Sequence, residues 1–214
     1  LKQARRTGVL LLSGNIGEGK SGMLQVLMEG LRADGRRVTG ILSPAVLQDG
    51  RRIGYDLVDV ASGRRTELSR INDRPGLAGR PSVGNFAFTP EGLHCGQEAL
   101  SPTAAAGADV VMVDEVGPWE LRDQGWAGRL YELTLETETP MIWVVRSDIV
   151  TQVCEHWALQ DPRIADLTTL TPEMLLRQTR KWLDREEGEA GFPLHEQWAA
   201  AFRAKHPACG ASPG

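Results

Sequence analysis

Residues 13–22 read SGNIGEGKSG and directly follow the apolar run GVLLL of residues 8–12. This stretch satisfies the pattern G-x-x-x-x-G-K-S/T of a phosphate-binding loop. In such a loop backbone N–H groups curl around an anion, the ammonium of Lys20 reaches the β- and γ-phosphates, and the hydroxyl of Ser21 can ligate magnesium. A helix that begins at Lys20 adds its positive end. The pattern predicts a nucleotide site made of Gly14, Asn15, Ile16, Gly17, Glu18, Gly19, Lys20, Ser21 and Gly22.

A pair of carboxylates selects among the reactions that a phosphate loop can serve. The segment VVMVDEVGPWEL, residues 110–121, is an apolar strand that ends in Asp114 and Glu115. In a phosphate-loop domain the strand beside the phosphate strand often ends in an Asp that holds magnesium, and Asp114 fits that position. Glu115 is then placed to orient and deprotonate a water molecule, which favours hydrolysis. For Glu120, steadying the loop or the magnesium waters and being an ordinary surface acid are equally good interpretations.

Composition excludes several classes of partner and compartment. The net charge is −4 and basic residues are scattered, so nucleic acid is not expected as a partner. Three cysteines at wide spacing indicate neither a disulfide framework nor a zinc site, and they suit a reducing cytoplasm. No apolar run approaches the ~18 residues of a membrane span, so no membrane association is expected. The expected location is therefore the cytoplasm.

The elements that must position these residues form an α/β pattern. Continuous apolar runs typical of strands buried on both faces cover residues 8–13, 37–43, 108–114, 140–146 and 163–170. Helical periodicity covers residues 20–33, 91–106, 121–137, 148–158 and 172–186. We therefore expect a RecA-like P-loop NTPase fold, in which helices cover both faces of a mostly parallel five-stranded sheet.

Residues 44–90 interrupt this alternation. Two turn signals, Asp49-Gly50 and Ser62-Gly63, flank an alternating segment, which predicts an antiparallel hairpin or three-stranded meander inserted after the second strand. From residue 186 the chain turns rich in Gly, Ala and Pro, with a short helix expected at 194–204. The expected organisation is a P-loop NTPase domain at 1–185 and a C-terminal appendage at 186–214.

The combination resembles a known family, the THEP-type nucleoside-triphosphatases that include the cancer-related nucleoside-triphosphatase of animals. The resemblance rests on four stretches within residues 8–146: GNIGEGKS, VTGILSPAVLQDGRRIGYDLVDV, SVGNFAFTPEGL and VVMVDEVGPWEL. A weaker similarity follows in LTTLTPEM. The most specific pieces are residues 52–55, RIGY, and residues 114–121, DEVGPWEL.

The resemblance implies magnesium-dependent hydrolysis of nucleoside triphosphates to diphosphates with weak base selectivity. It implies that Lys20 binds the phosphates, that Ser21 and Asp114 bind Mg²⁺, and that Glu115 activates the water. It also implies that Arg52 sits near the outer phosphates. The chain departs from the family at Ile16, where Pro is usual, at Ser21-Gly22, where Thr-Thr is usual, at Trp119 and at Asn85.

An arginine near the γ-phosphate can stabilise the charge of the transferred group. Arg52, Arg80 and Arg146 are candidates. Arg146 ends the fourth strand, where open α/β sheets face their ligand, and it ranks equally with Arg52.

Two other functions use the same phosphate loop. A nucleotide or small-molecule kinase would need a second pocket and an arginine-rich lid, and residues 147–163 offer only Arg163 for that lid. A nucleotide-controlled binding module would contact a protein partner through the 44–90 insert or the C-terminal tail. No N-K-x-D guanine signature occurs, which argues against a GTP-specific switch.

Overall fold

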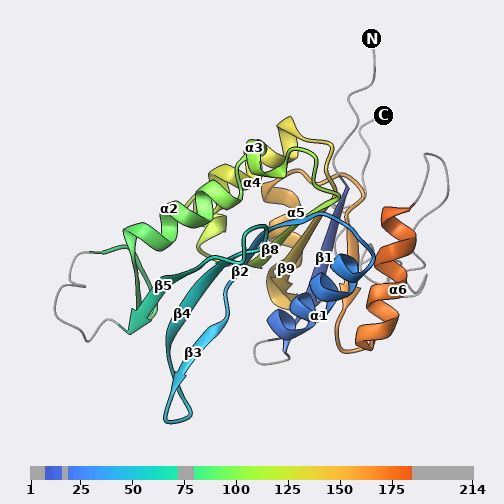
Figure 1. The fold of residues 1–214 in the computed structure, drawn as a ribbon. Helices are drawn as coiled ribbons and strands as arrows, with labels where there is room; N and C mark the ends of the chain where they lie inside the picture. Colours follow the sequence, from blue (N-terminus) through green and yellow to red (C-terminus); the bar gives the residue numbers. More distant parts are fainter. Residues whose placement is uncertain (1–7, 16–18, 72–79, 185–214) are drawn as a thin grey trace.

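The computed structural model describes residues 8–15, 19–71 and 80–184 (Figure 1). Its ten strands form one mixed sheet in the order β10-β1-β9-β8-β2-β4-β5-β7-β6, with β3 paired to β4. The strands are β1 Val9–Gly14, β2 Val38–Leu42, β3 Ala45–Gln48, β4 Arg51–Asp59, β5 Arg65–Ile71, β6 Ser82–Val83, β7 Phe86–Phe88, β8 Val110–Val116, β9 Met141–Arg146 and β10 Arg163–Asp166.

The five strands predicted from apolar runs are all present, and all are parallel. They are β10, β1, β9, β8 and β2, side by side in that order. Along β1, Val9 and Leu11 belong to one buried cluster, while Leu10 and Leu12 belong to the other. Because successive side chains of a strand point to opposite faces, a strand covered on both sides needs a continuous apolar run. This confirms the predicted α/β P-loop fold.

The predicted neighbour of the phosphate strand is wrong in one respect. β8, which carries Asp114, does not pair with β1, because β9 lies between them. Asp114 still reaches the phosphate loop, since the carboxyl ends of parallel strands meet at one edge of the sheet. The acidic pair is therefore brought to the loop across an intervening strand.

Helices cover both faces of the sheet (Figure 1). On one face lie α1 and α6, whose buried residues join the cluster of Leu10 and Leu12. On the other face the buried residues of α3, α4 and α5 join the cluster of Val9 and Leu11; α2 contacts β4 and β5 of the insert. The helices are α1 Lys20–Ala33, α2 Pro90–Ala99, α3 Pro102–Ala105, α4 Ala127–Glu136, α5 Val150–His156 and α6 Pro172–Leu183, with 3-10 turns at Glu120–Arg122 and Ser147–Ile149.

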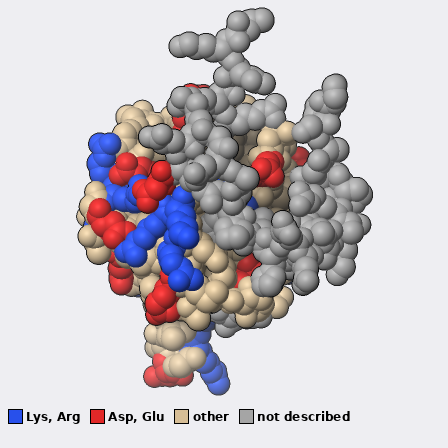
Figure 2. All heavy atoms as spheres, turned by 90° about the vertical axis from the view of Figure 1, so that its right-hand side faces the viewer, with Lys and Arg blue, Asp and Glu red and all other residues tan. Residues whose placement is uncertain are grey.

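Polar contacts join the two helices of the first face. Arg180 of α6 donates two hydrogen bonds, of 2.6 and 2.7 Å, to the carboxylate of Asp34 at the end of α1. Arg36 pairs with Asp184 beside them. Figure 2 views this side of the molecule, where Lys and Arg side chains lie among Asp and Glu side chains. The ion pairs thus add polar contacts to the apolar packing of α6 against α1.

Two predicted helices differ from the structure. The helix expected at 91–106 is divided into α2 and α3, because Ser101 caps a new helix and Pro102 occupies its first turn. The helix expected at 121–137 begins only at Ala127, since Asp123 and Gly125 have left-handed φ values of 58° and 56°. Each interruption comes from two residues whose local backbone preferences override the apolar periodicity.

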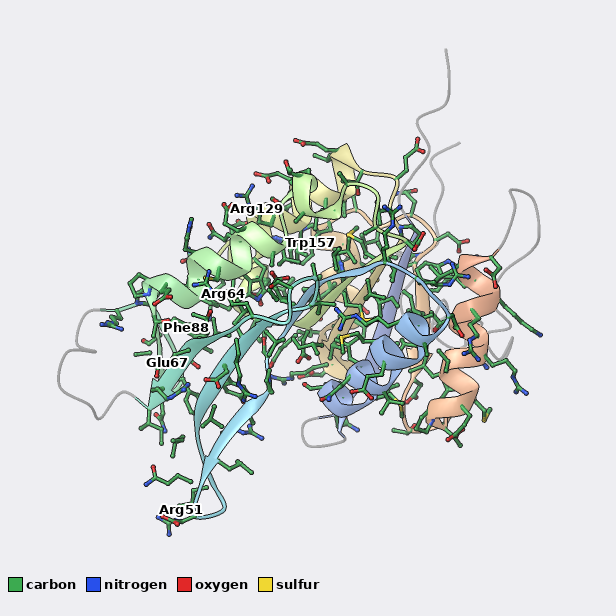
Figure 3. All side chains as sticks on the ribbon, in the orientation of Figure 1. Arg51, Arg64, Glu67, Phe88, Arg129 and Trp157 are labelled. Atoms are coloured by element: carbon green, nitrogen blue, oxygen red, sulfur yellow. The ribbon has the colours of Figure 1, made fainter. Side chains whose placement is uncertain are left out.

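The insert predicted at 44–90 is antiparallel and larger than a hairpin or three-stranded meander. It contains β3 to β7 and extends the parallel sheet, because β4 pairs antiparallel with β2. The turn predicted at Asp49-Gly50 joins β3 to β4, with φ values of 49° and 75°. Arg51, beside this turn, lies at the tip of a hairpin that projects from the body of the protein (Figure 3).

The predicted appendage at 186–214 and its short helix at 194–204 lie outside the described residues. The domain boundary placed at residue 185 therefore stays a prediction. Within the described residues no helix is both long and apolar enough to cross a membrane.

Candidate functional site

The phosphate loop connects β1 to α1, as its sequence predicts. β1 ends at Gly14 and α1 begins at Lys20, after Gly19 with a left-handed φ of 73°. The ammonium of Lys20 turns back to the loop and donates to the carbonyl oxygens of Gly14 at 3.0 Å and Asn15 at 2.5 Å. Ile16, Gly17 and Glu18 lie outside the described residues. The described part therefore places the lysine, the helix terminus and the loop carbonyls together.

Ser21 and Asp114, 93 positions apart in the chain, meet beside this loop. The Ser21 hydroxyl donates to Asp114 Oδ1 at 2.9 Å, and the backbone N–H of Ser43 donates to Asp114 Oδ2 at 2.9 Å. Ser43 directly follows β2, the strand next to β8. Only 1% of Asp114 is exposed, and this burial raises its pKa to about 6. A buried carboxyl that keeps two donors is held in one orientation.

The fit of these residues to a metal can be judged from their donor atoms. Mg²⁺ takes oxygen ligands and is commonly held by one or two protein groups together with substrate phosphates. Ser21 and Asp114 supply a hydroxyl and a carboxylate oxygen at one point beside the phosphate loop. The pair therefore fits a magnesium ion that also binds a nucleotide.

Glu115 occupies an unusual backbone position. Its φ is 69°, in the left-handed region that only a small share of non-glycine residues adopt. The pairing of β8 with β9 shifts register between Val113 and Val116, so Glu115 lies in a bulge of the strand. Bulges re-aim side chains and occur often beside active sites. The bulge leaves Glu115 exposed while Asp114 and Val116 on either side are buried.

Glu120 is a buried carboxyl that holds the loop following β8. Its Oε2 accepts from the Gly117 N–H at 2.9 Å and its Oε1 accepts from the Trp126 N–H at 3.4 Å. Burial raises its pKa to about 7. A Cβ at Gly125 would stand 2.3 Å from Glu120 Oε1, so the loop needs glycine there. Of the two interpretations of Glu120, these contacts support the steadying of the loop over an ordinary surface acid.

Of the three candidate arginines, Arg52 and Arg146 each have a partner close by. Arg52 of β4 donates to the Tyr55 hydroxyl at 2.9 Å, and burial of that tyrosine beside Glu115 raises its pKa. Arg146 ends β9 opposite Gly14 in the register of β1, and its guanidinium makes a two-point contact with Asp148. Arg146 thus lies at the carboxyl edge of the parallel strands and Arg52 lies on the β3–β4 hairpin beside Tyr55, and these contacts do not rank one above the other.

A cavity of about 340 Å³ opens on the side of Asp114 and Glu115 that faces the insert. Its lining combines polar site residues with aromatic side chains of the insert and of the loop after β8. The lining residues are Ser43, Tyr55, Leu68, Ser69, Val83, Gly84, Asn85, Phe86, Phe88, Asp114, Glu115, Gly117, Pro118, Trp119, Glu120 and Trp126.

Sequence reasoning missed Ser43 and most of this lining. The position of Ser43 at the carboxyl end of a predicted parallel strand was the signal that could have found it. The alternation of Phe86 and Phe88 in the sequence favours packing residues over base-stacking ones. No pattern in the sequence shows that Trp119 packs against Phe88, since that depends on how the loop after β8 folds back.

Comparisons with known proteins find similar sequences among nucleoside-triphosphatases. A sequence profile described as NTPase matches residues 9–178. The nucleoside-triphosphatase THEP1 of Methanopyrus kandleri is 31% identical over 166 residues, which cover 78% of this chain and 83% of that protein. The cancer-related nucleoside-triphosphatase homolog of Mus musculus is 33% identical over 144 residues, covering 64% of this chain and 72% of that protein.

A solved structure supports the fold. The solution structure of a human cancer-related nucleoside triphosphatase superposes with a TM-score of 0.64 at 23% identity, covering 84% of this chain and all of that one. The sequence profile and the archaeal relative confirm the resemblance noted in the sequence. Because the family profile spans most of its length and the archaeal relative aligns over 78% of it, the chain belongs to the NTPase family of P-loop enzymes.

Proposed function

We propose that this NTPase hydrolyses nucleoside triphosphates to diphosphate and phosphate in a magnesium-dependent reaction with weak base selectivity. The observation that carries the proposal is the 2.9 Å contact between Ser21 Oγ and Asp114 Oδ1, which joins the phosphate loop to the strand that bears Glu115. The relatives named nucleoside-triphosphatases support hydrolysis as the reaction. The missing N-K-x-D signature supports weak base selectivity.

Each residue has a role that follows from its position. The N–H groups of the phosphate loop and the start of α1 bind the phosphates, and Lys20 exchanges its loop carbonyl partners for phosphate oxygens. Ser21 and Asp114 would hold Mg²⁺, which when bound neutralises charge on the β- and γ-phosphates. Ser43 keeps Asp114 aimed at the loop.

Glu115 is the base that prepares the water. Its carboxylate accepts a proton as the water oxygen attacks the γ-phosphorus, and the bond between that phosphorus and the β–γ bridging oxygen breaks. The products are the nucleoside diphosphate and inorganic phosphate. Glu115 is exposed and can therefore meet a water molecule, whereas the carboxylates of Asp114 and Glu120 are buried and already accept hydrogen bonds from other groups of the protein.

The test is phosphate release from several triphosphates with wild type and Glu115→Gln, with and without magnesium. The Gln variant should lose about 10²- to 10⁴-fold in rate while binding of the magnesium nucleotide is retained. Glu132→Gln is a matched control, because Glu132 lies on α4 in an ion pair with Arg129 and away from the cavity. Unchanged phosphate release in Glu115→Gln would show that another group activates the water.

A kinase is a second candidate because the cavity beside Glu115 could hold an acceptor. The charged residues among its described lining are Asp114, Glu115 and Glu120, all acidic. Such a lining repels a nucleoside monophosphate, so the structure favours hydrolysis over nucleotide transfer. Transfer of labelled γ-phosphate to a nucleoside monophosphate at a rate above phosphate release would reverse this preference.

The projecting β3–β4 hairpin keeps the binding-module alternative open to test. Leu47 on this hairpin is 62% exposed, and Arg51 stands at its tip (Figure 3). A module of this kind would hydrolyse slowly until a protein partner contacts the hairpin. If a partner sharply raises phosphate release by the wild type but not by the Leu47→Asp variant, the binding module would be favoured over an enzyme that works alone.

A further inference from the structure

The cavity beside Glu115 has walls that hydrolysis does not need. Phosphate binding and water activation use groups at one end, namely Asp114 and Glu115. The remaining walls come from β4, β5, β6, β7 and the loop after β8, and no described residue of the phosphate loop lines them. The volume of about 340 Å³ is in the range of small-molecule sites, which bury most of a ligand.

Aromatic rings contribute much of the lining. Tyr55 and Phe86 of the insert meet edge to face, with centroids 5.4 Å apart. Phe88 and Trp119 stack across the insert and the loop with centroids 4.3 Å apart, and Trp126 completes the loop side. Figure 3 shows Phe88 between the insert strands and α2. Rings presented in this way favour a ligand that itself has a flat apolar face.

One buried polar group lies between these rings without a partner. Ser69 is fully buried, and its hydroxyl has no hydrogen-bond partner among the described residues. Its cross-strand partners are Tyr55 on β4 and Phe88 on β7, so its side chain shares the face of the sheet that lines the cavity. A buried hydroxyl without a partner costs free energy, and a ligand with a donor or acceptor group can recover it.

The charges of the lining restrict the ligand further. Among the described lining residues the ionisable groups with acid character are Asp114, Glu115, Glu120 and the Tyr55 phenol, and no lysine, arginine or histidine faces the cavity. A negatively charged ligand would be repelled by these carboxylates, whereas an amine would be attracted to them and to the ring faces.

We propose that this cavity is a second ligand site, which binds a neutral or positively charged aromatic molecule with one hydrogen-bonding group. The rings of Tyr55, Phe86, Phe88 and Trp119 contact its faces, and the Ser69 hydroxyl bonds its polar group. The site is separate from that of the nucleotide base: Glu115 marks the γ-phosphate end, a position that rests on the proposed function, and the base lies beyond the opposite end of the triphosphate.

Occupancy of the cavity has a consequence for the reaction. A ligand next to Glu115 displaces the water molecules from which the attacking water is drawn, so phosphate release slows when the ligand is bound. The nucleotide keeps its contacts with the phosphate loop, since none of the described residues of that loop lines the cavity. The ligand therefore lowers the rate and leaves nucleotide binding unchanged.

Three probes with the same ring and different charge test the proposal: indole, tryptamine and indole-3-acetate. Calorimetry or ligand-observed NMR on the full chain without nucleotide should show one site for indole and at least equal affinity for tryptamine. Indole-3-acetate should bind at least about tenfold more weakly because of the carboxylates. Equal or tighter binding of indole-3-acetate, or no binding of indole up to its solubility limit, would overturn the proposal.

A pair of variants places the probe in the cavity. Val83→Phe adds a ring to the cavity wall and should weaken indole binding by about tenfold or more, since overfilled sites exclude ligands. Leu47→Phe, on the same insert but outside the lining, should leave indole affinity unchanged. Equal effects of the two substitutions would mean that indole binds elsewhere, which contradicts the assignment.

Competition with nucleotide separates this site from the base site. Saturating magnesium ADP should leave indole binding intact. If indole were instead displaced in proportion to the ADP bound, the cavity would be the site of the nucleotide base and the proposal would be overturned. Indole binding does not depend on hydrolysis. Failure of the proposed catalytic roles would therefore appear in Glu115→Gln, and failure of the second site would appear in the probe titrations.

Discussion

Replacing the buried acid of the site should stabilise the protein while removing its activity. Asp114 is 1% exposed, and burial raises its pKa from 3.8 to about 6. A native pKa above that of the unfolded chain means that the native state holds the proton more tightly. The contribution of this group to stability is therefore fully present below pH 3.8 and is lost as the pH rises through about 6.

Asp114→Asn removes this loss of stability with rising pH, because the amide does not titrate. The amide can accept from the Ser43 N–H through its oxygen and donate to Ser21 Oγ through its nitrogen, so both observed contacts keep a partner. From the two pKa values, the stability advantage of the variant should grow by roughly 2 kcal/mol between pH 4 and pH 8. In a domain of this size that difference corresponds to roughly 4–8 °C in melting temperature.

The assay is denaturation of both proteins by urea across this pH range, in EDTA so that no metal shifts the titration of Asp114. Glu120, whose pKa is also raised by burial, titrates in both proteins and cancels in the difference. Phosphate release by the variant with magnesium should fall to background. A stability difference that is constant with pH, or that shrinks as the pH rises, would refute the assignment of a buried, weakly acidic Asp114.

Four further substitutions test three separate parts of the structure. Gly125→Ala should cost about 1–3 kcal/mol in a urea melt, because its φ is 56° and the new Cβ meets Glu120; an unchanged midpoint would contradict this. Thr179→Val should raise stability by about 1 kcal/mol, since its buried hydroxyl has no partner among the described residues. A loss of stability in the urea melt would contradict this expectation. If Arg52 or Arg146 contacts the γ-phosphate, its replacement by Ala should lower kcat by about 10³-fold and leave nucleotide affinity unchanged. Equal small effects of the two substitutions would exclude both arginines from this role.

Local patterns predicted the parallel half of the fold well. The strands around Leu11, Ile41 and Val113 read as continuous apolar runs because each is buried on both faces. The first helix also starts and stops where its sequence indicates, at Lys20 and before Gly35, whose φ is 80°. These features depend on neighbours in the chain, which a single sequence contains.

Features that depend on contacts across the sheet were harder to predict. The position of β9 between β1 and β8 leaves no mark in either strand, because all three strands are equally apolar. The cavity depends on Trp119 folding back onto Phe88, which requires the left-handed turns at Asp123 and Gly125. Helical periodicity through residues 121–137 concealed those turns.

The backbone of Glu115 connects the strain in this sheet to the proposed chemistry. A non-glycine residue with a left-handed φ of 69° costs of the order of 1–3 kcal/mol and persists only where its surroundings impose it. Before the bulge β8 pairs with β2 and β9, and after the bulge Glu120 accepts a hydrogen bond from the Gly117 N–H. The two acids of the segment DEVGPWE therefore work together, because buried Glu120 holds the turn that keeps Glu115 exposed beside Asp114.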